Sequence, residues 1–201
     1  MLIDAVKKVL SGGILPSSTP KITAADTGIV ILTHLFQSSQ FLIPNSQFLI
    51  LDVGTGSGCI GITLALELPN LKVLCTDISE EALAVARENA KRHNVLNRIT
   101  FLKTNLLPNP NPNPNPNPNP NPNPNPNPHP FLVVSNPPYI PDGTELPPDI
   151  ALFEPPEALH AGPEGMNVIA PLYEACRDHL SCVGCILECR QEQARKLTQQ
   201  L

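Results

Sequence analysis

The sequence predicts an α/β protein with a doubly wound, mostly parallel sheet. Apolar strand-like runs alternate with segments of helical periodicity, which is typical of parallel sheets covered by helices on both faces. A glycine-rich turn, Gly54-Thr-Gly-Ser-Gly58, follows one predicted strand and precedes a helix. Gly54, Asp77 and Asn136 each come directly after a predicted strand, where ligands bind in open α/β sheets.

The elements are expected in the following order. Residues 1–13 predict a short helix, and residues 14–21 a loop. The apolar runs 28–32 and 41–43 are not assigned, so residues 1–46 are set apart from a domain spanning 47–201. Its predicted strands are 48–53, 72–76, 99–102, 131–135 and 184–188. Its predicted helices are 58–68, 80–94, 170–180 and 191–201.

An unusual repeat interrupts this domain at residues 108–130, where every second residue is proline and nearly all the others are asparagine. Alternating proline removes backbone donors and blocks helix formation. We expect an extended, polyproline-like or disordered loop between the third and fourth of these strands. A repeat expansion in a tolerant surface loop is favoured over a ligand for a partner that recognises proline-rich segments.

The composition narrows the class of protein. The chain has 201 residues, 41% of them hydrophobic, with a formal net charge of -5 and no basic stripe. Nucleic-acid binders usually carry a clustered positive surface, so nucleic acid is disfavoured as the direct substrate. No apolar run is long enough to span a membrane, and the N-terminus does not resemble a secretory signal. We expect a cytoplasmic protein.

Cysteine spacing raises the question of a metal site. Cys182, Cys185 and Cys189, with His179 nearby, have spacings that metal ligands can adopt. The run 184–187 between them is apolar and strand-like, and an extended chain spreads side chains over both faces. We therefore expect no metal and reduced thiols.

The glycine-rich turn predicts a cradle for a nucleotide-like ligand. Glycines let the backbone approach a ligand, and the following helix presents free N–H groups. The spacing is G-x-G-x-G and not the G-x-G-x-x-G of dinucleotide binders. Asp77, after the next strand, suits the two hydroxyls of a ribose. The alternative for Asp77 is the N-cap of the helix that follows.

The tetrapeptide Asn136-Pro137-Pro138-Tyr139 predicts a site for a planar nitrogen group. The Asn136 side-chain carbonyl and a neighbouring backbone carbonyl can accept hydrogen bonds from a substrate NH2, and the Tyr139 ring can stack on the flat group. The prolines keep the turn in one shape. The alternative is an ordinary Asn-Pro turn at a strand end.

Together these motifs resemble the S-adenosylmethionine-dependent methyltransferases of the Rossmann-like class. Within that class, the stretches 153–159 (Phe-Glu-Pro-Pro-Glu-Ala-Leu) and 161–165 (Ala-Gly-Pro-Glu-Gly) resemble the HemK/PrmC branch. The resemblance implies transfer of a methyl group to the side-chain nitrogen of the glutamine in the Gly-Gly-Gln loop of peptide chain release factors. The cofactor would be S-adenosylmethionine, and the protein partner a release factor.

The resemblance also implies roles for individual residues. Asp77 would bind the ribose, and Asn105 would contact the adenine amino group, where relatives carry an acidic residue. Glu154 would have a structural role in the loop beside the substrate. The implied cofactor-binding residues are Asp52, Gly54, Thr55, Gly56, Gly58, Asp77, Asn105 and Asn136. Substrate binding is implied for Asn136, Pro137, Pro138 and Tyr139, of which Asn136, Pro137 and Tyr139 are the catalytic candidates.

Departures from the family pattern keep alternatives open. The N-terminal helical domain of relatives is not recognisable, and the chain ends soon after the strand at 184–188, so it resembles a chain truncated at both ends. We expect the last strands of the sheet to be lacking, which would leave that strand as an exposed apolar edge. The alternatives to an active glutamine methyltransferase are an adenine-N6 nucleic-acid methyltransferase and a non-catalytic, cofactor-binding remnant.

Overall fold

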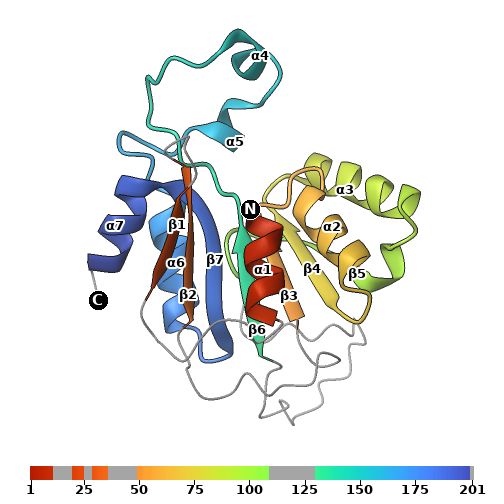
Figure 1. Ribbon diagram of the computed structural model, residues 1–201. Helices are drawn as coiled ribbons and strands as arrows, with labels where there is room; N and C mark the ends of the chain where they lie inside the picture. Colours follow the sequence, from red (N-terminus) through yellow and green to blue (C-terminus); the bar gives the residue numbers. More distant parts are fainter. Residues whose placement is uncertain (11–19, 25–28, 36–48, 109–129, 200–201) are drawn as a thin grey trace, which may run out of the picture.

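The computed structural model describes residues 1–10, 20–24, 29–35, 49–108 and 130–199. Among them, seven strands form one sheet in the order β1-β2-β7-β6-β3-β4-β5, with helices on both faces (Figure 1). The strands are β1 Lys21–Ala24, β2 Ile29–Leu35, β3 Leu49–Val53, β4 Lys72–Asp77, β5 Ile99–Lys103, β6 Phe131–Ser135 and β7 Cys182–Arg190. The β1–β2 and β2–β7 pairs are antiparallel, and the other pairs are parallel.

The helices complete the two outer layers of the fold. They are α1 Leu2–Leu10, α2 Cys59–Glu67, α3 Glu80–Arg92, α4 Pro148–Ala151, α5 Pro156–Leu159, α6 Ile169–Asp178 and α7 Gln191–Gln199, with a 3₁₀ turn, η2, at Leu96–Arg98. The predicted doubly wound, mostly parallel sheet is confirmed. The five predicted strands and the helices within 47–201 are present with small changes at their ends, the largest being the extension of β7 at both ends.

Alternating side chains of the strands feed two hydrophobic cores on opposite faces of the sheet. Ile50 and Val134 pack with α1, α2 and α3 in one core, and Leu51 and Val133 pack with α6 and α7 in the other. Both faces are therefore buried, which explains why the central strands read as continuous apolar runs. Tyr173 of α6 is the largest fully buried side chain in the second core.

One expectation about the edge of the sheet is wrong. β7 is an interior strand, because β2 pairs with it antiparallel from Ile29 opposite Arg190 to Leu35 opposite Gly184. The strands beyond β7 in the sheet are thus β2 and β1, which come from the N-terminal segment and not from residues that follow β7 in the sequence. The buried hydrogen bond of 2.5 Å between His34 Nδ1 and Tyr173 Oη joins β2 to α6.

The cysteines of β7 also differ from expectation. A register irregularity beside Phe131 and Leu132 places Cys182, Cys185 and Cys189 all in the second core, where they join Cys176 of α6. They therefore do not spread over both faces. All of these thiols are buried and free, and burial raises the pKa of Cys189 to about 12, so it stays protonated. Within the described ranges, no group of three or more potential ligands could hold a metal ion.

Some expectations concern residues outside the described ranges. They include nearly all of the proline repeat, at 109–129, and the apolar run at 41–43. Within the part of the chain that the structure describes, no helix is long and apolar enough to cross a membrane.

Candidate functional site

The carboxyl ends of β6, β3 and β4 meet at one edge of the sheet, because these strands are adjacent and parallel. The glycine turn after β3 lies in the middle. The turn at Asn136 flanks it on one side and Asp77 on the other. The glycine turn, Asp77 and Asn136 therefore lie side by side. They are far apart along the chain, since Val53, before the glycine turn, and Ser135, before Asn136, are separated by 82 positions.

The glycine turn presents bare backbone to open space. Gly54 and Gly56 have φ angles of 67° and 55°, a region that side-chain-bearing residues rarely adopt. A Cβ atom built on either glycine would have no atom within 4 Å. Thr55, between them, is buried, and its N–H donates to the Thr76 carbonyl at 2.9 Å. The turn therefore has one anchored side and one open side.

Asp52 supports this turn from beneath. Its Oδ2 accepts hydrogen bonds from Thr55 Oγ1 at 2.6 Å and from the Gly61 N–H at 2.9 Å. The side chain is completely buried, and this desolvation raises its pKa to about 6. Its Oδ1 is buried without a hydrogen-bond partner among the described residues. Asp52 thus joins the turn to the first turn of α2 rather than facing a ligand.

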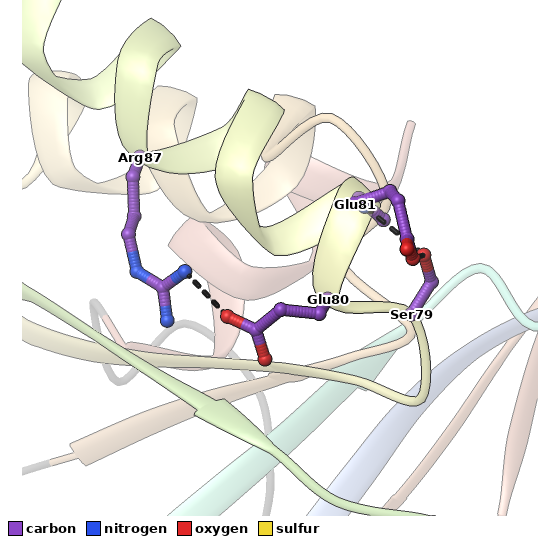
Figure 2. Close-up of polar contacts among 5 residues, drawn as sticks. Ser79, Glu80, Glu81 and Arg87 are labelled. Atoms are coloured by element: carbon purple, nitrogen blue, oxygen red, sulfur yellow. Dashed lines mark hydrogen bonds and ion pairs between the residues drawn. The ribbon is translucent and has the colours of Figure 1, made fainter.

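Asp77 links the glycine turn to the start of α3. Its Oδ2 accepts from the Gly56 N–H at 2.9 Å, and its Oδ1 accepts from the Ser79 N–H at 3.0 Å. The N-cap is Ser79, whose Oγ accepts from the Ala82 N–H at 3.1 Å. Figure 2 shows Ser79 at this helix start, with its hydroxyl directed at Glu81. The N-cap alternative for Asp77 is therefore wrong, and its partly exposed carboxylate lies beside the open turn.

The turn after β6 is held at several points. Ser135 Oγ donates to the Val53 carbonyl at 2.6 Å, which ties the end of β6 to the end of β3. Asn136 is exposed and Pro137 is buried. The half-buried Tyr139 donates its hydroxyl to Glu188 Oε1 at 3.2 Å. Burial and the nearby Glu188 raise the pKa of Tyr139 to about 12.

Gln193 is a supporting residue that the sequence did not reveal. Its Nε2 donates to the backbone oxygens of Tyr139 at 2.8 Å, Gly165 at 3.0 Å and Glu164 at 3.2 Å. Its Oε1 accepts from the Arg190 N–H at 2.9 Å, and the residue is only 4% exposed. Gly165 is required here, because a Cβ at this position would collide with the Tyr139 carbonyl. A single glutamine in a polar helix carries no local signal of this role.

Asn105 lies beyond the end of β5, at the same edge of the sheet. The Thr104 N–H donates to the Asp77 carbonyl at 3.0 Å, which holds the start of this segment against the end of β4. Asn105 itself is exposed. The edge thus offers open backbone at the glycine turn, a carboxylate at Asp77 and amides at Asn105 and Asn136. This donor and acceptor set suits a nucleoside-containing ligand.

Comparison with known proteins finds similarity to methyltransferases. A model of the "Methyltransferase small domain" family matches residues 23–114. A release factor glutamine methyltransferase from Chlorobaculum tepidum is 44% identical over 114 residues, which are 56% of this chain and 35% of the relative. One from Koribacter versatilis is 34% identical over 157 residues, covering 77% of this chain and 50% of the relative.

A third relative belongs to a longer kind of protein. A bifunctional methyltransferase from Rickettsia typhi is 37% identical over 153 residues, covering 75% of this chain and 27% of the relative. The match therefore spans half or less of the length of each of these relatives.

Proposed function

We propose that the chain is an S-adenosylmethionine-dependent methyltransferase of the Rossmann-like class, and that its site methylates a glutamine side-chain nitrogen in a peptide chain release factor. The observation that carries this proposal is the position of the Asn136–Tyr139 turn beside the open glycine turn. In this arrangement the Asn136–Tyr139 turn, which can hold a planar amide, lies next to the glycine turn, which can hold the cofactor. The names of the relatives support the choice of release factors as substrates.

The residues at the sheet edge fit the cofactor. Gly54 and Gly56 leave room for a ligand against the backbone, and Asp77 can accept hydrogen bonds from two ribose hydroxyls. Asn105 can accept from an adenine amino group through its side-chain oxygen. Asp52, Thr55 and Gly58 give the cradle its shape from the buried side. When bound, S-adenosylmethionine supplies an electrophilic methyl group.

The Asn136 turn has the task of orienting the substrate nitrogen. An amide nitrogen is a poor nucleophile because its lone pair is delocalised, so alignment of the nitrogen dominates the catalytic problem. The Asn136 side-chain oxygen and the Pro137 carbonyl accept the two N–H bonds of the substrate amide. The Tyr139 ring packs against the amide plane, and Pro138 keeps the turn rigid.

The proton of the amide nitrogen is not removed by Tyr139. Its pKa of about 12 keeps the phenol protonated near neutral pH, and its hydroxyl already donates to Glu188. The Asn136 and Pro137 oxygens instead stabilise the positive charge that develops on the nitrogen, which is electrostatic catalysis by preorganised acceptors. The proton then leaves to solvent.

The proposal is tested by a transfer assay with labelled S-adenosylmethionine. A release factor and adenine-containing DNA are offered side by side, and mass spectrometry locates the label. Label on the glutamine of the Gly-Gly-Gln loop is the expected result. Label on adenine would indicate the nucleic-acid alternative. Absence of label on both, from folded protein that binds the cofactor, would indicate a non-catalytic remnant.

A further inference from the structure

An arm, defined as residues Pro141–Leu159, extends from the edge of the sheet after Ile140. It carries α4, which stands clear of the rest of the molecule at the top of Figure 1, and α5, whose last residue, Leu159, returns to the base of the arm. Every residue of the arm is partly or fully exposed. The arm begins two positions after Tyr139, so anything bound to it lies close to the proposed substrate site.

The base of the arm is firmly attached. The Ile140 N–H donates to the Leu159 carbonyl at 2.9 Å, and the Ala161 N–H donates back to the Ile140 carbonyl at 2.9 Å. The Asp142 N–H adds a bond of 2.9 Å to the Gly162 carbonyl. These bonds close the two ends of the arm on each other. The arm therefore has a defined position relative to the Asn136 turn.

The tip of the arm presents apolar side chains to solvent. Leu152 is 75% exposed and Phe153 is 81% exposed, and they are adjacent in the chain. The surrounding backbone is ordered by hydrogen bonds from Leu152 N–H to the Pro148 carbonyl and from Glu154 N–H to the Ile150 carbonyl, both at 3.0 Å. An exposed Phe beside an exposed Leu on a fixed backbone can anchor a partner, because aromatic residues are enriched in the buried cores of interfaces.

The charge of the arm specifies the partner. No lysine or arginine occurs between Lys103 and Arg177, whereas the arm carries several exposed carboxylates. These are Asp142, Glu145, Asp149, Glu154 and Glu157. Glu154 belongs to this exposed set and has no side-chain hydrogen bond in the described part of the chain, and its structural role in the loop stays a prediction. Exposed carboxylates on an arm with an apolar tip complement a basic surface that contains an apolar side chain.

We propose that the arm docks a basic segment of the protein substrate, with Phe153 and Leu152 as its apolar anchors. This inference rests on the proposed function, because the docked protein is the one whose glutamine enters the site. The carboxylates attract the basic segment, and the anchors hold it. The docked segment lies outside the Gly-Gly-Gln loop itself, so a short peptide of that loop does not need the arm.

The test uses the whole chain and a full-length release factor. The variant Leu152→Ser/Phe153→Ser removes the anchors, and Asp149→Lys/Glu157→Lys reverses two charges. Leu180→Ser, at a 91% exposed position beyond α6, is the matched control. Equilibrium binding to the release factor is measured at low and high salt. The KM and kcat for methyl transfer are measured with the release factor and with a short Gly-Gly-Gln peptide.

We expect both arm variants to weaken release-factor binding by about 10-fold or more and to raise KM for the release factor, without changing transfer to the peptide. Salt should weaken binding by the wild type more than by the charge-reversed variant. Equal binding by the wild type and both arm variants would overturn the docking proposal. Failure of the wild type to label glutamine, by contrast, would overturn the proposed function, whatever the binding data show.

Discussion

Gln193 donates its side-chain amide to the backbone oxygen of Tyr139 at 2.8 Å. This bond joins α7, the helix after β7, to the turn after β6. The same Nε2 reaches the carbonyl of Gly165, so one buried amide holds two backbone segments together. The geometry of the Asn136 turn thus depends on a residue at its far side that cannot touch the substrate.

Replacement of Gln193 by alanine tests this dependence. Gln193→Ala leaves carbonyls without their donor, which should cost about 1–3 kcal/mol of folding stability. It should also lower kcat while the affinity for the cofactor stays unchanged, since the glycine turn is not involved. Gln191→Ala, at an exposed position of the same helix, is the control. Equal kcat values for the two variants would show that the hydrogen bonds of Gln193 do not position the turn.

Asp77 is predicted to act mainly on cofactor binding. Asp77→Ala should weaken cofactor affinity at least about 10-fold, because a carboxylate that accepts from hydroxyls and backbone donors is removed. Glu80→Ala, three positions later, breaks an exposed 3.0 Å ion pair with Arg87 (Figure 2) and should change affinity little. Titration calorimetry of both variants measures the affinity. Undiminished affinity in Asp77→Ala would rule out its role at the ribose.

Asp52 should make the stability of the fold depend on pH. Its pKa is about 6 in the folded protein and 3.8 ordinarily, so the folded state holds this proton more tightly. Its contribution is fully present below pH 3.8 and is lost as pH rises to about 6. The loss should be about 3 kcal/mol. Asp52→Asn cannot ionise. As pH rises from 3.8 to about 6, the unfolding free energy of the wild type, measured in urea, should therefore fall relative to that of the variant. Parallel curves would contradict the burial of a charge at Asp52.

The pairing of β2 with β7 makes a prediction about stability. Leu32 of β2 is completely buried in the second core, opposite Leu187. Leu32→Ala should therefore cost about 2–5 kcal/mol. Ile22→Ala in β1, at a position 37% exposed, should cost less than about 1 kcal/mol. Thermal unfolding measures both. Similar small losses would mean that β2 does not cover β7.

Much of the fold and the approximate place of the site could be predicted because their signals are local. The strand that ends before Gly54, the strand that ends at Asp77 and the strand that ends before Asn136 are each followed directly by residues typical of a turn. Parallel neighbouring strands then bring the three ends to one edge. The prediction needed no knowledge of which residues touch.

The parts that were missed depend on contacts between distant residues. Nothing in residues 29–35 specifies that this run pairs with residues 184–190, which are far away in sequence. The irregularity beside Phe131 moves Cys182 onto the same face as Cys185, although regular alternation would separate them. The role of Gln193 was missed for the same reason, since its hydrogen-bond partners Tyr139 and Gly165 lie far away in the sequence.

We propose that Asn136 presents the substrate amide for methyl transfer. The most direct measurement compares single-turnover transfer to a release factor by the wild type and by Asn136→Ala, with cofactor affinity measured in parallel. Removing one preorganised acceptor should lower the rate by about 10²–10³-fold and leave cofactor affinity nearly unchanged. A variant that transfers the methyl group at the wild-type rate would contradict the claim.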